Sequence, residues 1–302
     1  MKIAYYPGCS GEGTAVEYDR STRAVCRALD IELQDVPDWS CCGSTPAHAT
    51  SPVLSAALSA RNLRLAADAG AGCVLTPCPS CLSNMRHAAH NMQDGAFLAE
   101  VNGLLDRPAG ELPPTYSVLQ YICENRGLED ISRRVTHPLE GMKVAAYYGC
   151  LMVRPSSVMQ FDDPENPMSL DNLLRALGAE PVQFPFKTEC CGASHGVPRS
   201  DITAGLSGRI LASAMEFGAD AVVTACPLCQ MNLDLRQKQS EKAARRRFGL
   251  PVFYYTQLLA YAFGLPGDAV CLERLAVDPA PFFSEIGKRR DKRNAESTGG
   301  AR

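Results

Sequence analysis

Short apolar runs and longer amphipathic stretches alternate along the chain. Apolar runs at residues 2–6 and 144–148 predict buried β-strands, and each leads into a Gly-Cys pair. The longer stretches predict helices. The clearest begins at Ser51 and Pro52, a capping serine followed by a first-turn proline, and ends at Gly70. Strands that alternate with helices predict an α/β fold with mostly parallel sheets.

Two of the expected helices have apolar positions that would share one face at helical spacing. In the helix that follows Ser51 these positions are Leu54, Leu58, Leu65 and Ala69. In its counterpart, which ends before Gly218, they are Ile202, Leu206, Ile210, Ala214 and Phe217. We expect these faces to pack on the sheets.

The chain repeats itself. "IAYYPGC" at residues 3–9 matches "VAAYYGC" at 144–150, and "CCG" at 41–43 recurs at 190–192. "AGAGCVLTPCPSC", ending at Cys81, matches "FGADAVVTACPLC", ending at Cys229. Because the elements keep the same order at nearly constant offset, the sequence indicates a tandem duplication. We expect a first domain with a connecting segment over residues 1–140, a second over 141–286, and a disordered basic tail over 287–302.

Ten of the fourteen cysteines belong to the duplicated pattern. The first cysteine set is Cys9, Cys41, Cys42, Cys78 and Cys81, and the second cysteine set is Cys150, Cys190, Cys191, Cys226 and Cys229. The predicted strands deliver these residues to the carboxyl edge of a parallel sheet, where ligand sites of such folds lie. The five sulfurs of each set are therefore expected to converge.

Several kinds of site use clustered cysteines. Adjacent cysteines are poor disulfide partners, because their Cα atoms lie about 3.8 Å apart, below the usual range for a bridge. A structural zinc site and a cubane iron–sulfur cluster each take four ligands, which leaves one sulfur spare in each set. A cluster that five thiolates bind fits the pattern, and zinc in one of the two sets is the alternative.

Composition narrows the class of protein. The 302 residues are 46% hydrophobic, the net charge is −3, and no run of 18 apolar residues predicts a membrane span. Fourteen cysteines without a recognisable secretory leader favour a reducing compartment, so we expect a cytoplasmic protein. The basic residues at 245–247 and in the tail are interpreted as solvated, with no nucleic-acid role.

With both cysteine sets in view, the chain resembles the B subunit of heterodisulfide reductase, a family with tandem CCG domains. The resemblance covers about residues 1–270 and includes "YYPGC", "CPSC", "YYGC", "RPSSVMQFDDPENP", "CCGASHG", "CPLC" and "YYTQLLAYAFGLP". It implies two Rossmann-like repeats related by pseudo-two-fold symmetry, with a cluster at the strand ends of each. It also implies that each set binds a noncubane [4Fe–4S] cluster through all five of its cysteines.

The resemblance further implies an oxidoreductase that reduces a small or protein-bound disulfide to two thiols. We hypothesise that two clusters facing one pocket each deliver one electron and capture one sulfur. The partners would be a protein like the family's C subunit, with cubane [4Fe–4S] clusters, and a flavin-containing protein like its A subunit. The alternatives are a non-catalytic electron-transfer component of a respiratory or sulfur-metabolising complex, and a sulfur-transfer protein.

Four other residues are candidates near the cysteines. His48 and His195 follow the two vicinal pairs and could donate protons to leaving thiolates, although ordinary hydrogen bonding behind the ligands or at the surface is the favoured explanation. Lys187 and Arg154 could contact an anionic group. The simpler alternatives are a solvated lysine and an arginine paired with Asp162 or Asp163. The remaining cysteines, expected to be buried small hydrophobic residues, are Cys26, Cys73, Cys123 and Cys271.

Overall fold

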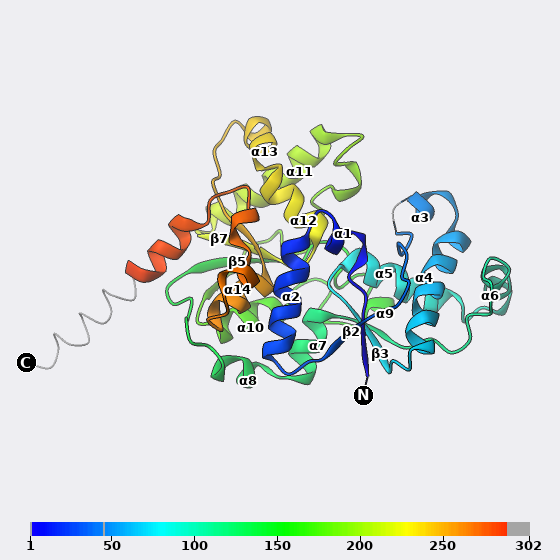
Figure 1. The fold of residues 1–302 in the computed structure, drawn as a ribbon. Helices are drawn as coiled ribbons and strands as arrows, with labels where there is room; N and C mark the ends of the chain where they lie inside the picture. The colour runs from blue at the N-terminus through cyan, green and yellow to red at the C-terminus, as the bar shows by residue number, and fades with distance from the viewer. Residues whose placement is uncertain (1, 45, 289–302) are drawn as a thin grey trace, which may run out of the picture. The chain divides into compact units, whose positions relative to one another are not determined.

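The computed structural model describes residues 2–44 and 46–288 (Figure 1), so the expected basic tail lies outside the described residues from position 289 onward. The chain divides into two compact units. The first comprises residues 1–126, 150–167 and 225–227, and the second comprises residues 127–149, 168–224 and 228–302. The domain boundary expected after residue 140 stays a prediction.

The first unit is built on a four-stranded parallel sheet with the strand order β2-β1-β3-β4. Ile3 pairs with Leu33 on one side and with Cys73 on the other, and Val74 pairs with Thr115. The strands are β1 (Ile3–Tyr5), β2 (Leu33–Asp35), β3 (Cys73–Thr76) and β4 (Thr115–Ser117). The helices are α1 (Gly8–Glu12), α2 (Val16–Ala28), α3 (Pro46–Thr50), α4 (Pro52–Asp68), α5 (Pro79–Asn91), α6 (Gly95–Asn102), α7 (Val118–Asn125) and α9 (Ser156–Met159).

The second unit repeats this plan with the strand order β6-β5-β7-β8, again all parallel. The strands are β5 (Lys143–Tyr147), β6 (Glu180–Val182), β7 (Ala221–Thr224) and β8 (Val252–Tyr254). The helices are α8 (Leu128–Arg133), α10 (Ser169–Ala176), α11 (Ser200–Glu216), α12 (Pro227–Gln230), α13 (Gln237–Ala244), α14 (Tyr255–Ala262) and α15 (Gly267–Val270). The second unit also has short turns of 3₁₀-helix at Ala193–His195 and Leu272–Arg274, a π-helical turn at Met231–Leu235, and a helical segment over residues 280–288.

The expected α/β fold with two tandem repeats is confirmed, and the strand order explains where the cysteines gather. After β1 the chain crosses to β2 on one side and then to β3 on the other, so the direction of winding reverses between β1 and β3. Ligands of open parallel sheets bind beyond the strand ends at such a reversal. Cys9 follows β1 and Cys78 follows β3, which places both beside this point.

The expected apolar face of α4 is wrong. Leu54 is 39% exposed, and the buried side of α4 consists mainly of alanines with Ser55, Ser59 and Asn62. The equivalent helix α11 departs from expectation at Phe217, which is 53% exposed just beyond its end. Where these helices face the CCG loops, the small polar residues Ser55, Ser59, Thr203 and Ser207 bond to the loop backbone. Leu63 of α4 and Ile210 and Leu211 of α11 are also buried.

The fourth strand of each sheet was not anticipated. β4 follows Pro113 and Pro114, and each of the two strands, β4 and β8, has only three residues, too few for an alternating pattern. Each leads directly into a helix. The side chain of Ser117 accepts a hydrogen bond from the backbone N–H of Gln120 and so caps α7.

The N-terminus of α4 is capped as expected, since the side chain of Ser51 accepts a hydrogen bond of 3.2 Å from the Leu54 N–H. Replacing Ser51 by alanine should lower the free energy of unfolding by about 1 kcal/mol, because a backbone donor loses its partner. Urea denaturation monitored by circular dichroism measures the change. Ser51→Asp, which keeps an acceptor, is the matched control, and an equal loss in both variants would contradict the capping role.

Candidate functional site

The first cysteine set surrounds the carboxyl ends of β1 and β3. Cys9 lies in α1, Cys41 and Cys42 lie in the loop after β2, and Cys78 is the N-cap of α5, with Cys81 in its first turn. Cys9 and Cys41 are exposed, whereas Cys42, Cys78 and Cys81 are buried. The set therefore has a buried side and a side open to solvent.

The vicinal pair and the CxxC pair meet within each unit. The Sγ atoms of Cys42 and Cys81 lie 3.4 Å apart, and those of Cys191 and Cys229 lie 3.6 Å apart. Both distances exceed the roughly 2.05 Å of a disulfide bond, and no disulfide joins any of the fourteen cysteines, all of which lie among the described residues. The second residue of each vicinal pair thus faces the second residue of its own CxxC.

The sulfurs of the first cysteine set influence one another electrostatically. Hydrogen bonds with Cys41 and Cys81 lower the pKa of the Cys42 thiol, and the same contacts raise the pKa of those two partners. The hydrogen bond with Cys81 likewise lowers the pKa of Cys78. Negative charge is therefore stabilised at the centre of the set, and a thiolate is the form of cysteine that binds metals.

Tyr6 lies among the same sulfurs. Burial, and then the charges of the cysteines, raise the pKa of its phenol. The cysteines that act on it are Cys81, Cys42, Cys41 and Cys9. Its hydroxyl donates a hydrogen bond of 2.7 Å to the carbonyl oxygen of Ser40, the residue before the vicinal pair. The neutral phenol of Tyr6 thereby fixes the backbone of Ser40, where the CCG loop begins.

The second unit supports its loop with equivalent bonds. Tyr147 donates to the carbonyl oxygen of Glu189 at 2.7 Å, as Tyr6 does to Ser40. The carbonyl oxygens of Cys42 and Cys191 accept hydrogen bonds of 3.0 Å from Ser59 and Ser207, respectively. The hydroxyls of Ser55 and Thr203 bind the carbonyl oxygens of Gly43 and Gly192 in the same way. The duplicated sequence therefore builds the same support twice.

The glycine of each CCG loop allows this close contact. Gly43 and Gly192 have φ angles of 84° and 80°, a region that side chains disfavour. A Cβ atom on Gly43 would lie 3.3 Å from the Cα of Ser55, and one on Gly192 would lie 3.0 Å from the Cα of Thr203. The loop backbone therefore rests on the helix backbone.

The glycines before Cys9 and Cys150 leave room for sulfur. A Cβ atom on Gly8 would lie 3.0 Å from the Sγ of Cys81, and one on Gly149 would lie 3.1 Å from the Sγ of Cys229. Both residues have positive φ angles, 71° and 70°. A sulfur-lined space kept free of side chains, with a stabilised thiolate at its centre, fits an iron–sulfur group.

Among residues 2–44 and 46–288, no three or more His, Cys, Asp or Glu side chains are gathered as ligands of one metal ion would be. Cys190, Cys191 and Cys229 lie in the second unit, whereas Cys150 and Cys226 lie in segments that belong to the first. That all ten cysteines are ligands stays a prediction.

The two histidine candidates are exposed. His48 lies in α3, and its backbone N–H donates to the carbonyl oxygen of Gly43. His195 ends a 3₁₀ turn, and its N–H donates to the carbonyl oxygen of Gly192. These backbone bonds hold the main chain of each histidine next to the glycine of its CCG loop, and proton donation by either side chain stays a prediction.

Lys187 is not a solvated residue. It is 5% exposed and forms an ion pair of 2.9 Å with Asp171, which is fully buried. Asp171 also accepts a hydrogen bond of 2.8 Å from the hydroxyl of Tyr148, and the carbonyl oxygen of Lys187 accepts hydrogen bonds from the N–H groups of Tyr148 and Gly149. This network orders the backbone before Cys150, and contact of Lys187 with a substrate stays a prediction.

Arg154 pairs with a carboxylate that the sequence analysis did not name. Its guanidinium lies 2.7 Å from Glu165 and donates to the carbonyl oxygen of Pro164. These bonds close the loop that follows Cys150, and an additional anion contact stays a prediction.

The four cysteines outside the two sets are mostly buried. Cys26, Cys73 and Cys271 are buried as expected, while Cys123 is partly exposed. Burial raises the pKa of Cys26 and of Cys123 to about 12, which keeps these two thiols protonated.

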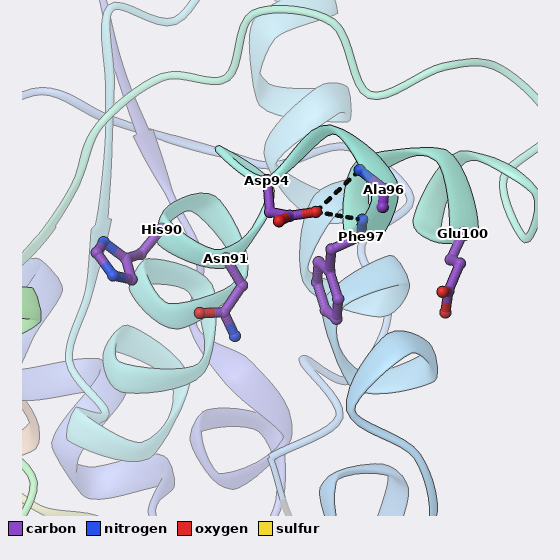
Figure 2. A pocket seen from close by; sticks show the side chains of 6 residues that line it. All are labelled: His90, Asn91, Asp94, Ala96, Phe97 and Glu100. Carbon is purple, nitrogen blue, oxygen red and sulfur yellow. Dashed lines mark hydrogen bonds between the residues drawn. The ribbon is translucent and has the colours of Figure 1, made fainter.

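A pocket of about 550 Å³ lies at the other end of α5 from Cys81 (Figure 2). Its lining comprises His90, Asn91, Asp94, Ala96, Phe97 and Glu100. The Asp94 carboxylate accepts hydrogen bonds of 2.9 Å from the N–H groups of Ala96 and Phe97, which is ordinary capping of α6 (Figure 2). This pocket contains no cysteine and does not contribute to the site.

The residues that support the cysteines were not predicted from the cysteine spacing or the apolar pattern. Tyr6, Ser59 and Asn84 recur as Tyr147, Ser207 and Asn232 in the second copy. Comparing the two copies position by position, rather than reading only their cysteines and apolar residues, would have found them.

Fold and site together define a duplicated cysteine-rich α/β protein. The cysteine-rich CCG domain family matches residues 3–86 and 144–234, and the chain belongs to this family in two tandem copies. None of the helices in the described part of the chain has the length and apolar character to cross a bilayer.

Relatives named for a fumarate reductase and relatives named for heterodisulfide reductase match nearly the whole chain. The chain is 33% identical to the 8-methylmenaquinol:fumarate reductase membrane anchor subunit of Wolinella succinogenes, over 92% of this chain and 97% of that protein. It is 28% identical to the B subunit of a ferredoxin/F420H2-dependent CoB–CoM heterodisulfide reductase of Methanosarcina acetivorans, over 94% and 97%. It is 30% identical to a protein of Archaeoglobus profundus named as like the B subunit of heterodisulfide reductase, over 89% and 93%.

A solved structure shares the fold. The crystal structure of a hypothetical protein from Helicobacter pylori matches with a TM-score of 0.72 at 14% identity. The match covers 92% of this chain and 52% of that one, so the chain spans about half of the solved protein.

Gly8→Ala should impair iron binding by the first cysteine set, because the added methyl group would enter the space beside Cys81. Iron and acid-labile sulfide per chain measure the effect. Gly70→Ala is the matched control, since Gly70 has a similar φ of 76° but nothing within 4 Å of the added Cβ. Both variants should lose about 1–2 kcal/mol of stability through backbone strain. Equal iron content in the two would contradict the role assigned to Gly8.

Lys187→Met should destabilise the second unit by about 3–5 kcal/mol, because the buried carboxylate of Asp171 would lose its counter-charge. The double variant Lys187→Met with Asp171→Leu should regain part of this loss. Chemical denaturation of the three proteins measures the differences. A loss below about 1 kcal/mol in the single variant would contradict a buried, paired lysine.

Proposed function

We propose that the chain is an iron–sulfur subunit that reduces a disulfide to two thiols, in the manner of the B subunit of heterodisulfide reductase. The observation that carries the proposal is the pair of equivalently supported vicinal-cysteine and CxxC contacts, Cys42 with Cys81 and Cys191 with Cys229. Relatives named for that B subunit cover nearly the whole chain and support it.

In this proposal each cysteine set binds one noncubane [4Fe–4S] cluster through its five thiolates. When bound, such a cluster supplies one-electron transfer. The first turn of α5 offers backbone N–H groups that favour an anionic group beside Cys78 and Cys81. The absence of side chains at Gly8 and Gly149 leaves space beside the sulfurs, and the support bonds keep the thiolates in place.

Reduction of one disulfide consumes two electrons and two protons and yields two thiols. Two sets that each pass one electron meet the first requirement. His48 and His195, exposed beside the vicinal pairs, meet the second as proton donors to the leaving thiolates. Electrons arrive from partner proteins. The expected partners are a protein like the family's C subunit, with cubane [4Fe–4S] clusters, and a flavin-containing protein like its A subunit.

A second candidate function is electron transfer without disulfide chemistry. The identity of 33% with a component of a menaquinol:fumarate reductase favours it. In that case the clusters would pass electrons between a quinol and a partner enzyme, and a disulfide would have no specific effect on them.

One experiment separates the two functions. Anaerobically prepared protein should contain about eight irons per chain, as two four-iron clusters require. Titrating oxidised and reduced protein with candidate disulfides should produce a new paramagnetic state in electron paramagnetic resonance spectra. The matching dithiols and Cys42→Ser protein serve as controls. Full iron content with spectra that disulfides leave unchanged would favour electron transfer, and iron content clearly below two four-iron clusters would contradict the two-cluster proposal.

A further inference from the structure

The two units use the same residue differently beside the vicinal cysteines. Asn84 and Asn232 each lie three residues after the last cysteine of a CxxC pair. Asn84 donates to the carbonyl oxygen of Cys42 at 2.5 Å and to Ser59, and its side-chain oxygen accepts from Ser55 at 2.9 Å. Its amide is used entirely for supporting the loop.

Asn232 makes a different bond. Its side-chain N–H donates to the Sγ of Cys191 at 3.5 Å, within the usual range for a sulfur acceptor. The residue has no exposed surface, and its amide oxygen finds no hydrogen-bond partner among the residues that the structure describes. An unpartnered buried oxygen costs about 1–3 kcal/mol, so a role confined to packing does not explain an asparagine here.

A local change in the backbone accompanies this difference. α5 runs as a regular helix past Asn84, whereas the helix that begins at Pro227 widens into a π-helical turn at Met231–Leu235. The N–H of Arg236 donates to the carbonyl oxygen of Met231, five residues earlier, as a π turn requires. Asp234, which accepts hydrogen bonds from Ala276 and Val277, anchors the turn.

In the first unit a different residue donates to the sulfur of Cys42, the counterpart of Cys191. Ser44 donates hydrogen bonds to Cys42 through its hydroxyl and its backbone N–H. The equivalent residue in the second copy is Ala193, which has only the backbone donor. One sulfur therefore bonds to a half-buried loop hydroxyl and the other to a fully buried amide.

We propose that Asn232 is the hydrogen-bond donor that sets the reduction potential of the second cysteine set. This rests on the proposed function only in that the set binds an iron–sulfur cluster. A cluster becomes more negative on reduction, so a donor to a ligand sulfur stabilises the reduced state and raises the potential. The bond acts more strongly in the low dielectric of a buried site.

Redox titration of the anaerobic protein, followed by electron paramagnetic resonance, tests the proposal. Asn232→Leu, which removes the donor at similar volume, should lower one of the two cluster potentials and leave the other unchanged. We expect about a tenfold change in the equilibrium constant of reduction, equivalent to about 59 mV for one electron. Ser44→Ala should lower the other potential.

A rescue variant makes the test specific to the hydrogen bond. Adding Ala193→Ser to Asn232→Leu restores a hydroxyl donor at the position of Ser44 and should raise the lowered potential again. Unchanged potentials in Asn232→Leu would overturn the proposal. So would loss of iron from both Asn232→Leu and the near-isosteric Asn232→Asp, because Asn232 would then be a structural support.

Disulfide assays on the same samples keep the two proposals apart. If the potentials shift as expected while disulfides leave the spectra unchanged, the role of Asn232 stands and the reductase function fails. If disulfides change the spectra of every variant and no potential shifts, the reductase function stands and the role of Asn232 fails.

Discussion

The hydroxyl of Ser59 donates to the carbonyl oxygen of Cys42, and that of Ser207 donates to the carbonyl oxygen of Cys191. These bonds hold two adjacent sulfurs in place on a loop that has no strand or helix of its own. They require the loop to lie directly on a helix backbone, which is possible only with glycine at positions 43 and 192 and with small residues on the facing helix. The crowding of sulfur at the strand ends depends on this contact.

The same constraint explains which parts of the protein could be predicted. The strands before Cys9 and Cys78, the cap at Ser51 and the duplication follow from local patterns of the sequence, and the structure confirms them. The buried face of α4 did not follow, because hydrophobic periodicity assumes that large apolar residues face inward. Here the inward face meets a backbone loop, so Leu54 faces outward and Ser55 and Ser59 face inward.

Some residues of the candidate site could likewise be predicted from the sequence, and others could not. Cysteine spacing identified the residues that meet, including Cys42 with Cys81. It could not identify the partner of Lys187, because Asp171 lies 16 residues away and only the packing of α10 against the sheet brings the two charges together. Nor could it distinguish Asn84 from Asn232, which are identical residues at equivalent positions. The difference lies in a π-helical turn, which single residues do not encode.

Duplication produced two supports of the same design, with the same tyrosine, serine and glycine roles, yet the residues that touch the sulfurs differ between them. A protein that passes one electron at each of two sites can keep the same backbone framework at both and still have a separate reduction potential at each. The two units share the backbone contacts between loop and helix, and they differ in the residues that donate hydrogen bonds to sulfur. If each cysteine set holds one multi-iron cluster, anomalous diffraction at the iron absorption edge from anaerobically grown crystals should show two groups of iron peaks. One group should be bonded to Cys42 and Cys81, and the other to Cys191 and Cys229. A lone tetrahedral ion at either set, or iron that the vicinal cysteines do not bind, would contradict this prediction.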